Sequence, residues 1–303
     1  MAVPESTAVS ASPDRGATTA WQRGALGLLL TPIVVGIAAT VLPGTQVGEA
    51  SADLIVFGGA ASTTLAALAI AAAWYPPPRR HFALGALAAI ALGVLAGTGV
   101  TSVAAAITVD AALVALAWAI GTSIGRRIEH PGHLLPACVV VASADAISTV
   151  SSFGPTHAIA ASTRALSILA VSFPVPGTSS LAPALGVGDL VFVAIVLGAV
   201  AAHGLSLARA ALLCWLGVAV AGALSAVLQT AVPALVPLGA AVVLGIPASR
   251  RLRPRDRRVA NLAMALAVSA LAATIAAQLI HGEAHRGRLG GRVDFSLHTS
   301  ATR

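Results

Sequence analysis

Charged and aromatic residues are scarce in this 303-residue chain, and lysine is absent. Only 10% of the residues are charged and 4% are aromatic, whereas 57% are hydrophobic and the mean hydropathy is +0.90. About a quarter of an ordinary soluble domain is charged. A water-soluble fold of this length cannot bury so much apolar surface, which excludes a cytosolic enzyme, a disordered chain and a secreted disulfide scaffold. The composition predicts a protein that crosses the lipid bilayer several times.

The two cysteines and the arginines exclude further kinds of site and partner. Cys138 and Cys214 both lie in apolar segments, which argues against a structural disulfide or a cysteine-ligated zinc site. The net charge of +7 comes entirely from arginines, which form short clusters between apolar runs. We interpret these clusters as signals of membrane topology and expect no nucleic-acid partner.

A membrane-spanning helix needs about 20 mostly apolar residues, and nine segments of the chain approach this length. The predicted spans are residues 24–43, 53–75, 82–99, 103–124, 134–153, 185–206, 209–230, 231–248 and 259–280. They predict an all-α fold, a transmembrane helix bundle over residues 24–280. Residues 1–23 are predicted to be a polar cytosolic tail and residues 281–303 a polar C-terminal tail.

Arginines cluster after the second, fourth, sixth and eighth predicted spans. These residues are Arg79, Arg80, Arg126, Arg127, Arg209, Arg250, Arg251, Arg253, Arg255, Arg257 and Arg258. The positive-inside rule then places the N-terminus in the cytoplasm and the C-terminus outside. The longest connection, residues 154–183, lies on the outer side. Its apolar stretch Ala165–Phe173 is too short to span, so a re-entrant or interfacial helix is expected there.

Of the eleven carboxylates, Asp53 sits at the boundary of a predicted span, and only Asp110, Asp145 and Asp189 lie inside apolar segments. An ionisable side chain at the bilayer centre costs at least about 2.5 kcal/mol on insertion scales, which makes each of them a candidate functional residue. A structural hydrogen-bonding role is the alternative for each acid. No motif surrounds Asp110.

Asp145 is predicted to lie near the middle of its span, on one helix face with Ser148, Thr149 and Ser152. This polar stripe is expected to face water or another acid. The next span opens with Gly186-Val187-Gly188-Asp189, where two glycines leave room for a helix or a substrate backbone beside the carboxylate. Because consecutive spans run antiparallel, Asp145 and Asp189 are predicted to face each other.

The third motif is Pro233-Ala234-Leu235, at the start of the predicted span 231–248. A proline there removes a helical hydrogen bond and loosens the backbone. The order of Asp145, the GxGD tetrapeptide and the PAL tripeptide resembles the presenilin and signal peptide peptidase family of intramembrane aspartyl proteases. Their flanking residues look most like those of prokaryotic members. The resemblance covers about residues 134–248.

Two features depart from the family pattern. Ala144 stands where the family normally has a tyrosine before its first aspartate. The family also has five spans before that aspartate and ends on the PAL helix, whereas four spans are predicted before Asp145 and one after the PAL segment.

The resemblance implies that Asp145 and Asp189 are the catalytic pair and share one proton, because two like charges in close contact do not both ionise cheaply. It implies a substrate-positioning role for Gly186, Gly188 and the tripeptide Pro233, Ala234 and Leu235. It also implies transmembrane helices or signal peptides as substrates, no metal or cofactor, and a place in a prokaryotic cell membrane.

Other functions remain open at this point. A proton- or cation-coupled transporter also needs intramembrane acids, although no matching halves are visible. An inactive relative that only binds helices is a second alternative, and a prepilin peptidase, which lacks a PAL helix, is a third. The GxSxG pattern at Gly121–Gly125 and the polar group Glu129, His130 and His133 match a serine-hydrolase motif and a metal site only weakly.

Overall fold

The computed structural model describes residues 49–74, 78–100, 102–151, 154–175, 178, 181–228 and 230–282. The predicted span 24–43, the N-terminal tail and all but the first two residues of the C-terminal tail lie outside this part of the chain.

The described chain is mostly helical, as the composition predicted. The longer helices are α2 (Glu49–Ala73), α3 (Pro78–Thr98), α4 (Val103–Gly125), α5 (Leu134–Val150), α8 (Val187–Ala202), α9 (Leu207–Leu228), α10 (Leu235–Gly245) and α11 (Arg257–Gly282). The short elements are η1 (Pro131–His133), α6 (Pro155–Ala160), α7 (Thr163–Leu169), η2 (Pro247–Arg250) and the strands β1 (Ala170–Pro174) and β2 (Leu181–Gly186).

In the described part of the chain, six helices are long and apolar enough to cross a membrane, namely α2, α3, α4, α5, α9 and α11. The apolar helices α8 and α10 are shorter, at 16 and 11 residues. At 1.5 Å per residue, α10 extends only about 17 Å, roughly half of the hydrocarbon thickness. It is shorter than the predicted span 231–248 because the chain becomes helical only at Leu235. Pro233 lacks an N–H group and disfavours helical geometry in the residue before it.

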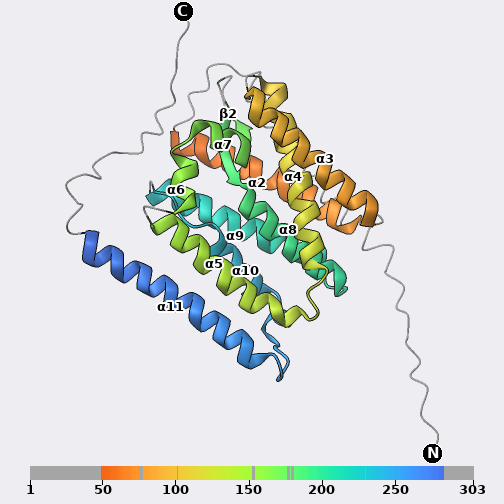
Figure 1. The fold of residues 1–303 in the computed structure, drawn as a ribbon, viewed down its shortest axis with the longest axis vertical. Coiled ribbons are helices and arrows are strands. Elements are labelled where there is room, and N and C mark those ends of the chain that lie inside the picture. The colour runs from red at the N-terminus through yellow and green to blue at the C-terminus, as the bar shows by residue number, and fades with distance from the viewer. Residues whose placement is uncertain are drawn as a thin grey trace, which may run out of the picture.

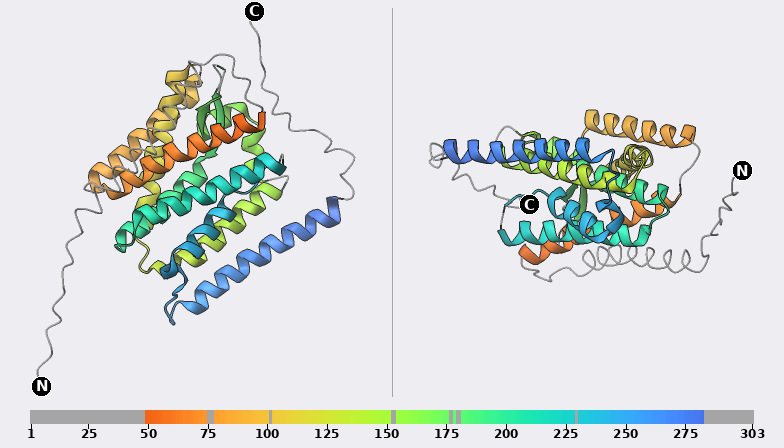
Figure 2. Two further views of the ribbon diagram at one scale, coloured as in Figure 1. Left: turned by 180° about the vertical axis from the view of Figure 1, so that it is seen from behind. Right: turned by 90° about the horizontal axis from the view of Figure 1, so that it is seen from below.

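Helix α8 lies at the centre of the bundle, and nine of its sixteen residues are buried. Its main contacts are with α4 and α2. Figures 1 and 2 show α11 at one edge of the molecule and α3 at the opposite edge. Because α8 is apolar on all sides, it is suited to this central position between other helices.

Glycines allow α4 and α8 to approach closely. A Cβ atom added to Gly125 would lie 2.2 Å from the carbonyl oxygen of Ile195, and one added to Gly121 would lie 2.6 Å from that of Val191. By contrast, a Cβ atom added to Gly93 on α3 would have no neighbour within 4 Å.

The arginine clusters gather at one end of the bundle. The Arg126 side chain at the end of α4 donates to the carbonyl of Ala72 at the end of α2. The His203 ring at the end of α8 donates to the carbonyl of Ile128. Arg164 is at the opposite end, where its guanidinium donates to the carbonyl of Ala96 near the end of α3.

The prediction of a helix over Ala165–Phe173 is only partly correct. Helix α7 ends at Leu169, and the chain continues as β1, which pairs with β2 in an antiparallel hairpin. The segment Ala170–Pro174 contains valine and phenylalanine and ends at a proline, features that favour a strand over a helix. The hairpin leads directly into the GxGD tetrapeptide.

The close contact between α4 and α8 gives the first testable prediction. Replacing Gly125 with alanine forces its new methyl group against the α8 backbone, so we expect the free energy of unfolding to fall by about 1–3 kcal/mol. Gly93→Ala is the matched control and should not destabilise the protein. Reversible unfolding by denaturant in detergent micelles measures both. Equal stabilities of the two variants would contradict the packing described here.

Candidate functional site

The Asp145 carboxyl binds the start of the PAL helix. Asp145 is half-buried on α5, five residues before that helix ends at Val150, and so is nearer the helix end than predicted. Its Oδ2 accepts a hydrogen bond from the backbone N–H of Leu235 at 3.0 Å. Leu235 is the first residue of α10, and N–H groups in the first turn have no partner within their own helix. The carboxylate supplies that partner and also lies at the positive end of the α10 dipole.

The Asp189 carboxyl lies at the start of α8. Gly186 is the N-cap of that helix, and its N–H group donates to Asp189 Oδ2 at 3.3 Å. This is the return hydrogen bond of a capping box, in which an acid at the third helical position accepts from the N-cap backbone. The Asp189 carboxylate is therefore stabilised locally, by the hydrogen bond from Gly186 and by the positive end of the α8 dipole.

The helices that carry the two acids are not each other's main packing partners. Helix α5 packs mainly on α10 and α11, whereas α8 packs mainly on α4 and α2, and α10 contacts both α5 and α8. The PAL segment connects the two acids, because Leu235 binds Asp145 while Ala234 and Asp189 border the same pocket.

That pocket has a volume of about 190 Å³. It is lined by Phe57, Ala184, Asp189, Ala221, Gly222, Ser225, Ala231, Val232 and Ala234. Its volume is below the roughly 300 Å³ at which pockets for whole small molecules begin. The walls are mostly small and apolar, and Asp189 is the one ionisable side chain among them. Such a space suits an apolar side chain or a short piece of backbone next to a carboxyl group.

The glycines of the GxGD tetrapeptide do not serve helix packing. A Cβ atom on Gly186 would meet only the Asp189 carboxylate, at 3.4 Å, and one on Gly188 would have nothing within 4 Å. Gly188 is exposed. Within the described residues no helix packs against these two glycines, so the approach of a substrate backbone stays the prediction for the space beside Asp189.

Pro233 and Ala234 precede α10, and the backbone from Ala231 to Pro233 is neither helix nor strand. Within the PAL tripeptide, only Leu235 is helical, and its side chain is buried. Ala234 is the N-cap of α10, with φ −70° and ψ −26°, and its carbonyl accepts the Leu238 N–H. The irregular backbone beside the site is therefore limited to Ala231–Pro233.

One member of the predicted polar stripe of α5, Ser148, contacts the start of α6. The Ser148 hydroxyl pairs with the Thr156 hydroxyl at 2.6 Å and accepts the Thr156 N–H at 3.1 Å. Ser148 therefore anchors the start of α6. Ser152, the last residue of the stripe, lies outside the described residues.

Asp110, the third intramembrane acid, has a different partner. Its Oδ1 accepts a hydrogen bond from the backbone N–H of Ser172 in β1, at 2.9 Å. Asp110 thus has the structural hydrogen-bonding role that was the alternative for every intramembrane acid.

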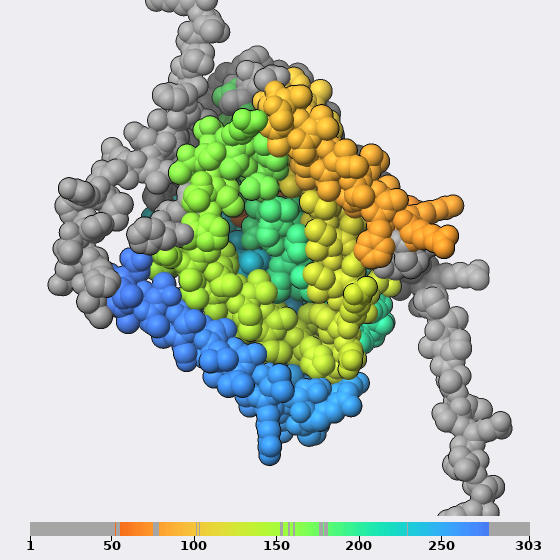
Figure 3. Space-filling model, viewed as in Figure 1, coloured from red at the N-terminus to blue at the C-terminus, as the bar shows by residue number. Residues whose placement is uncertain are grey.

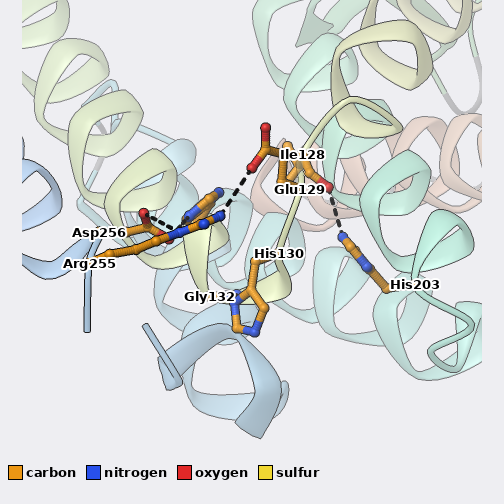
Figure 4. A network of polar contacts seen from close by, with 8 residues as sticks. Ile128, Glu129, His130, Gly132, His203, Arg255 and Asp256 are labelled. Carbon is orange, nitrogen blue, oxygen red and sulfur yellow. Dashed lines mark hydrogen bonds and ion pairs between the residues drawn. The ribbon is translucent and has the colours of Figure 1, made fainter. Parts of the chain in front are cut away.

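The polar residues at the arginine-rich end form turns and ion pairs (Figure 4). His130 accepts the Gly132 N–H, and Arg255 lies 3.8 Å from Glu129. The His133 ring lies 3.0 Å from Asp256, and this hydrogen bond holds the pKa of the Asp256 carboxyl below its usual range. Among the described residues, no three His, Cys, Asp or Glu side chains are placed to hold a metal ion.

The serine-hydrolase pattern at Gly121–Gly125 lies inside α4, where the Ser123 hydroxyl donates to the carbonyl of Ala119 within its own helix. The pattern therefore lacks the strand-to-helix elbow that its chemistry requires.

Sequence reasoning did not identify Phe57, Ala184 or Ser225 as neighbours of Asp189. Phe57 belongs to α2, more than a hundred residues away in the chain, and its ring lies against Gly222 on α9. No motif marks these positions. Only the packing of α2 on α9 brings Phe57 to the pocket.

The hydrogen bond between Leu235 and Asp145 gives the second prediction. In Asp145→Ala the Leu235 N–H loses its acceptor, so its hydrogen exchange should become about tenfold to a hundredfold faster, as expected for a lost bond to a charged group. Asp145→Asn keeps an acceptor oxygen and should show a smaller change. Residue-resolved amide exchange measures both variants. Unchanged protection of Leu235 in Asp145→Ala would contradict the contact.

Comparisons of the chain with protein-family models, curated proteins and solved structures found no match.

Proposed function

We propose that the protein is an intramembrane aspartyl protease in which Asp145 and Asp189 form the catalytic pair. One observation carries this proposal. The PAL segment binds the Asp145 carboxyl through Leu235 N–H and borders the Asp189 pocket through Ala234. One short segment of backbone therefore lies beside both acids, which is the arrangement that this chemistry needs.

The reaction follows from the shared proton of the pair. The ionised carboxylate takes a proton from a water molecule, whose oxygen attacks the carbonyl carbon of the substrate peptide bond. The protonated carboxyl donates its proton to the carbonyl oxygen. As the C–N bond of the tetrahedral intermediate breaks, the carboxyl that took the proton from water gives it to the leaving nitrogen. The other carboxylate takes a proton from a hydroxyl of the intermediate, which restores the shared proton of the pair. We treat the two roles as belonging to the pair rather than to either residue.

The surroundings of the acids favour an apolar peptide as the substrate. The pocket next to Asp189 offers small apolar walls, and Gly188 leaves open space on the other side of the same helix turn. Figure 3 shows the molecular surface hollowed between α4 and α5, with α8 visible on the floor. A peptide bond is open to attack only after its helical hydrogen bonds are broken, and polar backbone groups freed in a membrane need new partners.

The arginine clusters support an orientation for this reaction. They gather at the end of the bundle opposite the hairpin, which places the GxGD and PAL segments toward the outer side by the positive-inside rule. This matches the sense of signal peptide peptidases. Substrates with a cytoplasmic N-terminus, such as leftover signal peptides, are then favoured.

Cleavage of a model transmembrane peptide by the purified protein tests the proposal. We expect Asp145→Asn and Asp189→Asn each to lower the rate at least about a hundredfold, because each removes an acid–base group while keeping an oxygen that accepts a hydrogen bond. Glu129→Gln, a change at an exposed acid in the arginine-rich end, should leave the rate unchanged. Mass spectrometry of the products locates the cut.

Full activity in either aspartate variant would contradict the mechanism. Failure of the wild-type protein to cut any apolar peptide would contradict the proposed function. A transporter would then show uptake of a proton or cation into vesicles that depends on the same acids, and an inactive relative would bind peptides without either activity.

The orientation has its own test in intact cells. The native cysteines are buried, so single new cysteines can be labelled selectively with a membrane-impermeant thiol reagent. We expect labelling of Ala161→Cys, beside the hairpin, and no labelling of Arg255→Cys until the membrane is opened. The reverse pattern would reject the proposed orientation while leaving the chemistry intact.

A further inference from the structure

The hairpin before the GxGD tetrapeptide contains an irregularity. Val171 pairs with Leu185, but the next residue, Ser172, pairs with Pro183. Ala184 therefore has no partner in β1 and forms a β-bulge. Bulges bend a strand and redirect the residues that follow it.

The Asp110 carboxyl holds the strand opposite this bulge. Ser172 N–H donates to Asp110 Oδ1 at 2.9 Å, at the step where the register shifts. Without this acceptor the N–H group would be left unsatisfied in an apolar environment, which costs about 1–3 kcal/mol. A two-stranded hairpin is at best marginally stable by itself, so an external contact of this strength has a large effect.

Helix α4, which carries Asp110, is a firm support. It is packed against α8 through Gly121 and Gly125, where the two backbones are nearly in contact. The Asp110 carboxylate therefore fixes β1 to α4, and α4 is packed against α8, the helix that begins in the GxGD segment. Arg164 fixes the preceding α7 to α3.

The bulge is connected to the candidate site by a very short segment. Ala184 lines the pocket together with Asp189, and Leu185 is almost fully buried. Gly186 donates its N–H group to the Asp189 carboxylate. A shift of the bulge therefore moves one wall of the pocket and the hydrogen-bond donor of Asp189 at the same time.

We propose that Asp110 is a positioning residue, whose bond to Ser172 holds the bulge that places Ala184 and Gly186 around Asp189. Its consequence for peptide cleavage rests on the proposed protease function, whereas its consequence for the hairpin does not. Asp110 acts by accepting a hydrogen bond, so an asparagine at this position, which also presents an oxygen acceptor, replaces most of the effect.

Amide hydrogen exchange tests the structural part in the full-length protein. In Asp110→Ala, we expect the amides of both Ser172 and Gly186 to exchange at least about tenfold faster than in the wild type. In Asp110→Asn, the exchange rates of the Ser172 and Gly186 amides should be close to those of the wild type. Thr108→Ala, which removes a hydroxyl bonded within the same helix, is the control and should change neither amide. Faster exchange at Ser172 with an unchanged Gly186 would overturn the proposal, because the bulge would then not reach the site.

Cleavage kinetics test the catalytic part. We expect Asp110→Ala to lower kcat about tenfold to a hundredfold with KM within about threefold, and Asp110→Asn to recover most of the loss. If Asp110→Asn loses activity as fully as Asp110→Ala while both amides stay protected, Asp110 acts through its proton or charge and the proposal is wrong. If the wild-type protein cuts no peptide, the protease function fails, and the exchange rates alone decide the positioning role.

Discussion

The hydrogen bond from Leu235 N–H to the Asp145 carboxylate is the contact on which the candidate site depends. A carboxylate inside a membrane protein needs donors, and the start of a helix needs acceptors. One bond satisfies both needs and fixes the PAL segment to α5. Because α5 and α8 pack on different neighbours, this segment is also what connects Asp145 to the pocket of Asp189.

All three acids in apolar segments are stabilised in the same way, because each carboxylate accepts a hydrogen bond from a backbone N–H group. Each accepts a backbone N–H group at the end of a helix or in a strand: Leu235 for Asp145, Gly186 for Asp189 and Ser172 for Asp110. They differ in what lies beside the carboxyl. The PAL segment lies beside both Asp145 and Asp189. Asp110 is joined to the hairpin instead.

The positions of most helices follow from the lengths of the apolar runs. The predicted segment 103–124 corresponds to α4 at Val103–Gly125, for example, because both its ends are marked by polar residues. Hydropathy fails where a short apolar stretch is not a spanning helix. It misses β1, whose residues are as apolar as those of a helix, and it overestimates α10, because Pro233 delays helix formation until Leu235.

The order of the motifs predicts that Asp145, Asp189 and the PAL segment lie together, and the structure shows the PAL segment bonded to Asp145 and bordering the pocket of Asp189. The contribution of Phe57 to the pocket arises from the contact of α2 with α9, which no local pattern encodes. The role of Asp110 needs the hairpin register, since a one-residue change of pairing would move Ser172 N–H away from the carboxylate.

The central claim is that Asp145 and Asp189 act on one reacting group. Equilibrium binding of an apolar peptide in which a hydroxyethylene unit replaces the scissile amide tests this most directly, because its hydroxyl imitates the tetrahedral intermediate and needs both acids. The account predicts tight binding to the wild type and a loss of about a hundredfold or more in both Asp145→Asn and Asp189→Asn. Equal binding to the wild type and to either variant would contradict it.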